Sequence, residues 1–122
     1  MDAPLPPTPG HSHSHVSADF IGVPVEQLRD ATLLGGLLIA AASAGGFRPI
    51  GVPVVREHKA SGSVSAVLLA DDAHIAIHAL PARQTLLFDL VAPASHDFRK
   101  ALEVFARRLT ARDIKSDTRG RG

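Results

Sequence analysis

Three consecutive segments in the middle of the chain constrain the fold most. Residues 63–70 (SVSAVLLA), 74–80 (HIAIHAL) and 84–92 (QTLLFDLVA) each have the pattern of a β-strand, and the first two are joined around Asp71 and Asp72. Strands that are linked by such short connections pair with one another in antiparallel fashion. The sequence therefore predicts an antiparallel sheet at the centre of the fold.

The segments before this region predict a strand, a helix and a second strand. Residues 15–22 alternate in the manner of a strand, and residues 23–46 form a predicted helix that a Gly-Gly pair ends. Residues 47–58 have strand character but contain two prolines. Because proline cannot donate a hydrogen bond to a neighbouring strand, we expect this strand to be broken or to lie at an edge.

The segments after the central region complete the fold class. Residues 95–110 predict an amphipathic helix, because apolar residues recur at i, i+4, i+7 and i+11 from Phe98. We expect a last strand at residues 112–117. The predicted class is α+β: a two-layer α/β sandwich in which two helices cover one face of a mainly antiparallel sheet.

Composition limits the classes of function. A chain of 122 residues with 45% hydrophobic residues and a net charge of +1 is predicted to be globular and to have no nucleic acid as its main partner. The absence of cysteine excludes disulfides, zinc–thiolate sites and cysteine nucleophiles. The longest apolar run, residues 31–46, is shorter than the roughly 18 residues of a membrane span. Since no basic and then apolar leader opens the chain, we expect a cytoplasmic protein without a membrane partner.

We expect the chain to have three parts. Residues 1–13 are predicted to be a disordered leader rich in proline and histidine, residues 14–118 the folded domain, and residues 119–122 a flexible tail. The alternating histidines of the leader lack a fixed geometry. We therefore predict no metal site there.

The predicted strand at residues 74–80 carries two histidines. His74 and His78 are four residues apart in an element of period two, so both project to one face with Ala76 between them. Their separation of roughly 13 Å along the strand is too long for both to bind one metal ion. Each is either a packed histidine or a general acid–base group, since imidazole titrates near neutrality.

The segment at residues 63–82 (SVSAVLLADDAHIAIHALPA) resembles the self-cleavage region of the bacterial-type S-adenosylmethionine decarboxylase proenzyme family. The resemblance extends from about residue 14 to the C-terminus. It implies a two-layer sandwich that pairs into a homodimer. Members of this family cleave their own chain at a serine, which becomes a pyruvoyl cofactor for decarboxylation.

The resemblance places Ala73 at the position of the cleavage serine. Because a methyl group cannot attack a carbonyl carbon, we expect no pyruvoyl and no other cofactor. The family's proton-donating cysteine falls near Pro93, and its ribose-binding acid falls at Ala82. Its adenine-stacking aromatic should lie near Lys59 or Ala60, neither of which can stack. Four departures at one site are typical of natural divergence.

Other positions retain the family's residues. The resemblance places Ser65 on a serine that assists processing and His78 on a histidine that acts in processing and catalysis. The candidate catalytic residues are His78, Ser65 and His74. The candidate substrate-binding residues are Asp72, Ala73 and Asp89. Ser65 and His78 are either a nucleophile–base pair across neighbouring strands or a plain polar contact, and Asp71 with Asp72 is a turn or a carboxylate pair.

Three functions remain open from the sequence. The first is a repurposed enzyme of specialised metabolism that acts on a small-molecule ligand by histidine acid–base chemistry, without pyruvoyl. The second is a catalytically dead regulatory partner of an active decarboxylase. The third is a true S-adenosylmethionine decarboxylase that a serine-to-alanine replacement at residue 73 traps as its precursor. The sequence favours the first.

Overall fold

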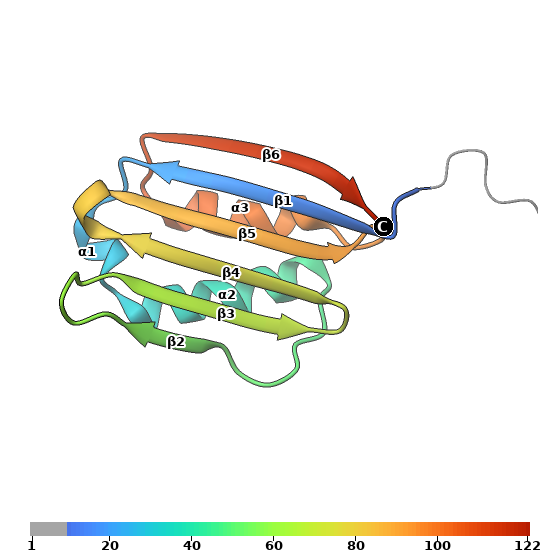
Figure 1. The fold of residues 1–122 in the computed structure, drawn as a ribbon, viewed down its shortest axis with the longest axis horizontal. Helices are drawn as coiled ribbons and strands as arrows, with labels where there is room; N and C mark the ends of the chain where they lie inside the picture. The colour runs from blue at the N-terminus through green and yellow to red at the C-terminus, as the bar shows by residue number, and fades with distance from the viewer. Residues whose placement is uncertain (1–9) are drawn as a thin grey trace, which may run out of the picture.

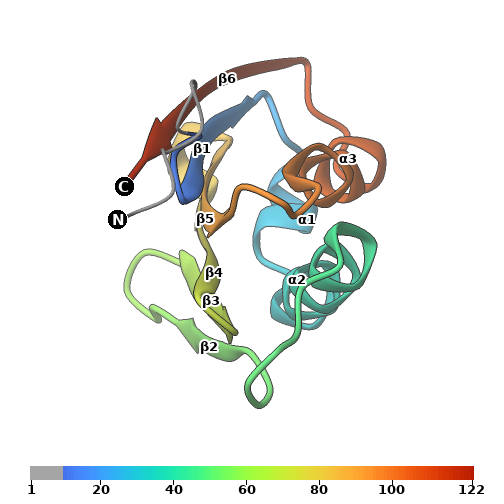
Figure 2. The ribbon, with the colours of Figure 1, turned by 90° about the vertical axis from the view of Figure 1, so that its right-hand side faces the viewer.

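The computed structural model describes residues 10–122. The elements in chain order are β1 (His13–Ile21), α1 (Val25–Leu28), α2 (Ala31–Gly45), β2 (Val54–Glu57), β3 (Val64–Ala70), β4 (Ala73–Leu80), the 3₁₀ turn η1 (Pro81–Arg83), β5 (Thr85–Pro93), α3 (Phe98–Arg108) and β6 (Asp113–Arg121). Within these residues the strands form one antiparallel sheet in the order β2-β3-β4-β5-β1-β6. Among residues 10–122 the helices lie on one face of this sheet, and no helix covers the other face, which we call the bare face (Figure 1, Figure 2). The predicted α+β sandwich is confirmed.

The helix that the sequence predicts at residues 23–46 is divided into α1 and α2. Asp30 leaves the helical conformation, and its Oδ1 accepts a hydrogen bond from the backbone N–H of Leu33 at 2.9 Å. This contact is an N-cap, which begins a new helix. At the other end Gly46 adopts a φ of 78°, and this left-handed residue ends α2 as the Gly-Gly pair predicts.

The core lies between the sheet and the helices. Phe88 contacts Phe105 with a ring-centroid distance of 5.2 Å, and Phe20 lies 6.4 Å from each of them. These rings come from β5, α3 and β1, so their burial fixes the helical layer on the sheet. On β4 the residues that face this core are apolar, and Ile75 and Ile77 are fully buried.

The two edge strands differ from each other in length. β2 has four residues and, among the described strands, pairs with β3 alone, which confirms the edge position that the prolines before it predict. β6 has nine residues and pairs with β1 as far as Arg121. Residues 119–121 are therefore strand, and the prediction of a flexible tail was wrong there because backbone pairing needs no apolar pattern.

The described part of the predicted leader begins at Gly10. His13 already belongs to β1, so the sheet starts one residue before the predicted domain boundary. The rest of that leader, residues 1–9, lies outside the described residues. Of the helices between residues 10 and 122, none has both the length and the apolar character that crossing a membrane requires.

Candidate functional site

The bare face of the sheet carries the candidate histidines. On β4, His74, Ala76 and His78 alternate with the core residues, so their side chains project away from the helices. This confirms that both histidines lie on one face with Ala76 between them. They do not share a contact, and each belongs to a separate polar cluster.

The first cluster is formed by Ser65, His78 and His58. Ser65 and His78 are direct neighbours in the β3–β4 ladder, and Ser65 Oγ lies 2.8 Å from His78 Nδ1. The same Oγ lies 3.0 Å from Nε2 of His58. A hydroxyl donates one hydrogen bond and also accepts, so it can donate to one imidazole nitrogen while it accepts an N–H from the other. The arrangement can therefore pass a proton between two imidazoles.

His58 is a site residue that the sequence analysis missed. It follows β2, and the backbone N–H of His58 donates to Ser63 O at 2.8 Å, so the β2–β3 hairpin continues through it. Because Arg56 pairs with Ser65, the side chain two residues later lies on the same face. This contact could be found from the sequence by aligning residues 54–67 as the two arms of a β-hairpin, which places His58 and Ser65 on the same face.

The second cluster is formed by His74, Asp89 and His15. Asp89 Oδ1 accepts a hydrogen bond from His15 Nε2–H at 2.7 Å, and Oδ2 accepts one from His74 Nε2–H at 3.3 Å. Burial raises the pKa of Asp89, but the hydrogen bonds and the charge interactions with His15 and His74 outweigh it and hold that pKa below its ordinary value. The ionised carboxylate thus fixes both rings, and it joins β4, β5 and β1.

Asp72 and Ala73 lie in the tight turn between β3 and β4. Asp72 has a φ of 55°, and its carbonyl oxygen accepts a hydrogen bond from His13 Nε2–H at 3.0 Å. Asp71 and Asp72 therefore form a turn, which is one of the two interpretations that the sequence leaves open, the other being a carboxylate pair. Ala73 is only 8% exposed, and its methyl group lies on the core side of β4. Neither residue contacts the Ser65–His78 cluster.

A small pocket adjoins the first cluster. It has a volume of about 190 Å³ and is lined by Val54, Arg56, Ser65, Ala66, Val67, Ala76 and His78. Most of these residues are aliphatic, and none is acidic. The pocket therefore combines an apolar wall, a hydroxyl, an imidazole and a guanidinium.

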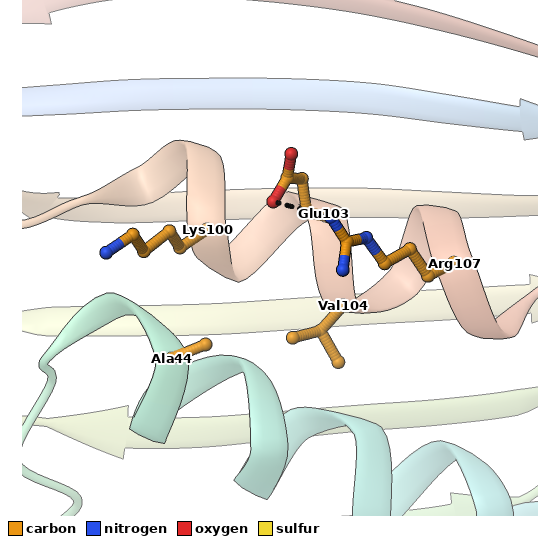
Figure 3. A pocket seen from close by; sticks show the side chains of 5 residues that line it. All are labelled: Ala44, Lys100, Glu103, Val104 and Arg107. Carbon is orange, nitrogen blue, oxygen red and sulfur yellow. Dashed lines mark ion pairs between the residues drawn. The ribbon is translucent and has the colours of Figure 1, made fainter.

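A larger hollow lies on the helix side of the molecule (Figure 3). It has a volume of about 290 Å³ and is lined by Ala44, Lys100, Glu103, Val104 and Arg107. Glu103 and Arg107 form an exposed ion pair at 3.8 Å, which contributes little to stability. The sheet separates this hollow from the histidines, so we place the candidate site at the Ser65–His78 pocket.

The chain matches known proteins in both sequence and fold. The family model described as S-adenosylmethionine decarboxylase matches residues 14–122, which contain nearly all of the sheet and all three described helices. The chain belongs to the S-adenosylmethionine decarboxylase family. The arginine decarboxylase proenzyme of Aeropyrum pernix is a relative in sequence, 30% identical over 99 residues that cover 80% of this chain and 75% of that protein.

The fold of this S-adenosylmethionine decarboxylase family member also matches a solved structure. The crystal structure of the adenosylmethionine decarboxylase from Aquifex aeolicus gives a TM-score of 0.82 at 20% identity, over 93% of this chain and 92% of that one. Among residues 10–122, no three histidine, aspartate or glutamate side chains are arranged to hold a metal ion.

Proposed function

We propose that this member of the family is a small-molecule enzyme that moves protons with histidine and uses no pyruvoyl cofactor. The observation that carries this proposal is the Ser65 hydroxyl, which lies 2.8 Å from one imidazole and 3.0 Å from another beside an aliphatic pocket. A positioned general acid–base group accelerates proton transfer roughly 10²- to 10⁴-fold. The cluster has the components of such a group.

The residues of β4 do not fit a pyruvoyl group. That group is made from a side-chain hydroxyl that attacks the preceding backbone carbonyl, and the sequence of β4, AHIAIHAL, contains no serine, threonine or cysteine. The side chain at position 73 is a methyl group packed on the core side. We therefore derive no catalytic step from this cofactor.

His78 has the leading role in the proposed chemistry. Its Nδ1 is occupied by Ser65, which leaves Nε2 to exchange a proton with the ligand. Ser65 orients this ring and connects it to His58, so a proton taken up by His78 can leave through the hydroxyl. His74, held by Asp89, assists less directly because its bonded nitrogen faces the carboxylate.

We also infer that the chain forms a homodimer through the bare face of the sheet. Leu69 and Leu87 point outward from β3 and β5 on this face, and Leu69 is 57% exposed. Exposed apolar side chains that are rimmed by polar groups mark interaction surfaces. Burial of this face would also exclude water from the neighbouring histidine clusters, which strengthens their electrostatic interactions.

A regulatory partner of an active decarboxylase is the second candidate function. The same bare face favours it, since a face that accepts a second copy of this fold can also accept a related chain. In that case the histidine clusters would be structural. The two candidates differ in whether the isolated protein converts any compound.

One experiment separates them. The purified protein and its His78→Gln variant are each incubated with an extract of small metabolites supplemented with S-adenosylmethionine and arginine, and mass spectrometry follows every compound. A compound that the wild type and an exposed control variant, His11→Gln, convert but His78→Gln does not supports the enzyme. No conversion by the wild type, together with a changed rate when it is mixed with an intact decarboxylase of the family, contradicts it.

A further inference from the structure

We propose that the Ser65–His78 pocket binds a small carboxylate anion with an apolar body, and that Arg56 anchors the carboxylate. This inference rests on the proposed function, because it assigns a class of ligand to the same pocket. It goes beyond that function in naming the charge of the ligand and the residue that selects it.

Arg56, Ser65 and His78 form a row across three neighbouring strands. Arg56 pairs with Ser65 in the β2–β3 ladder, and Ser65 pairs with His78 in the β3–β4 ladder. All three side chains lie on the bare face and line the pocket. Adjacent strands are about 4.8 Å apart, so the two ends of the row are separated by roughly 10 Å. One small molecule can therefore contact both ends.

The charge of this row has no counterion in the pocket. No carboxylate of residues 10–122 lies within ion-pair distance of Arg56, and Nη1–H of Arg56 donates to Val55 O at 2.9 Å. Since a guanidinium carries five N–H donors, most of its donors remain for a ligand. Glu57 is the next residue on β2 and therefore points to the opposite face.

The two imidazoles that contact Ser65, one in the row and one beside it, add to this preference. His78 and His58 are neutral or positive but never negative, and the lining residues include no acid. Asp89 pairs with Ala76 across the β4–β5 ladder, and its two carboxylate oxygens are bound by His15 and His74. A ligand with a positive charge would meet repulsion in this pocket, whereas a carboxylate would meet a planar donor that it binds in a bidentate manner.

The remaining wall selects an apolar body. The side chains of Val54, Val67 and Ala76 line the pocket between the polar groups, whereas Ala66 borders it from a strand position whose side chain faces the core. Aliphatic contacts favour a hydrocarbon portion by removing its surface from water. The volume of about 190 Å³ restricts that portion to a few carbons. A branched or short aliphatic carboxylate combines both requirements.

The test uses three compounds with one carbon skeleton and different charges. The probes are 4-methylpentanoate, 4-methylpentanamide and 4-methylpentylamine, each titrated into the ¹⁵N-labelled full-length protein while amide chemical shifts are recorded. We expect the carboxylate to shift the amides of Ser65, Ala76 and His78 in a saturable manner at millimolar concentration. The neutral amide should bind at least about tenfold more weakly, because a charged hydrogen-bond partner is lost, and the amine should not bind.

Matched variants test the role of Arg56. Arg56→Gln should weaken binding of 4-methylpentanoate about 10- to 100-fold, the range for a lost charge-assisted pair. Arg99→Gln removes the same charge from α3, on the opposite side of the sheet, and should leave the affinity unchanged. Ala76→Leu fills the pocket from the bare face while it keeps Arg56, and it should abolish binding. It also serves as the second variant if Arg56→Gln does not fold.

Several outcomes overturn the inference. These are binding of the amine or the amide as tight as that of the carboxylate, shifts centred away from the row, no binding of any probe, or unchanged binding in both Arg56→Gln and Ala76→Leu. The assay requires no turnover. Saturable carboxylate binding without conversion of any metabolite therefore supports this inference and contradicts the proposed enzyme. If the protein instead converts a cation in a His78-dependent manner and binds no carboxylate, the proposed enzyme is supported and this inference is contradicted.

Discussion

Ser65 and His78 face each other across the β3–β4 ladder, with the Ser65 hydroxyl oxygen 2.8 Å from Nδ1 of His78. Both side chains stand on regular strands that have a hydrogen-bonded neighbour on each side. Strands hold a side chain more rigidly than loops do. The pair is therefore in position for proton transfer before any ligand binds.

Replacement of His78 tests this pair. His78→Gln keeps a hydrogen-bonding side chain but does not titrate near neutrality, so we expect a roughly 10²- to 10⁴-fold loss of any conversion that the protein performs. His78 is exposed, so the melting temperature should hardly change. His74→Gln should cost less activity. A His78→Gln protein that unfolds, or that retains full activity, would contradict the assigned role.

The integrity of the chain tests the absence of a pyruvoyl group. Ala73 offers no hydroxyl for self-cleavage, so intact mass spectrometry should show one species of 12.8 kDa that does not react with hydroxylamine. Two fragments separated between residues 72 and 73 would contradict the assignment.

Restoring a serine at position 73 tests whether the alanine is the only change. Ala73→Ser places a hydroxyl on the core side of β4. We expect little or no release of carbon dioxide from S-adenosylmethionine, because Pro93, Ala82 and Lys59 still stand where the resemblance places the proton donor, the ribose-binding acid and the stacking aromatic. Robust turnover would favour a trapped precursor instead.

The pKa of Asp89 predicts a dependence of stability on pH. Its pKa in the folded protein lies below the ordinary value, so its contribution is fully present above the unfolded pKa of about 3.9 and is lost as the pH falls through the folded pKa. Asp89 is 45% exposed, so we expect the contribution to be at most about 1 kcal/mol. Urea midpoints of wild type and Asp89→Asn should therefore differ at pH 6 and converge in acid. A difference that grows in acid would have the wrong sign.

The oligomeric state tests the bare face. We expect light scattering to give the mass of a dimer at micromolar concentration, and we expect Leu69→Lys to shift the equilibrium towards monomer. Ile39 on α2 is similarly exposed, at 53%, but lies on the helix side, so Ile39→Lys is the matched control. A wild-type monomer, or equal effects of the two substitutions, would contradict an interface on this face.

The strands with one face against the core could be predicted from the sequence, because burial of that face makes apolar and polar residues alternate. The segments 64–70, 73–80 and 85–93 each have one side against the core, and the sequence shows it. β6 is exposed at every residue, so the alternation that marks the other strands gives no indication of where it ends. The break at Asp30 is a local capping contact inside an otherwise continuous helical pattern, which periodicity does not detect.

The candidate site was predictable only in part. His74 and His78 were found from the strand pattern, and Ser65 and Asp89 were found through the resemblance. The structure pairs Ser65 with His78 and His74 with Asp89. His15 was not singled out as a site residue because 74 residues separate it from Asp89. Such contacts follow from the strand order of the sheet, in which β1 lies between β5 and β6.

The shortness of β2 divides the pocket into a stable part and a weakly held part. Ser65 and His78 are fixed by the interior of the sheet, whereas Arg56 depends on the four-residue edge strand β2. Edge segments with few ladder bonds open at a much lower free energy than the interior of a sheet. If Arg56 selects the ligand as we propose, substitutions in β2 can change that selection at small cost to folding. In evolutionary terms, the proposed ligand preference could then change without any change to the residues proposed to carry out the chemistry.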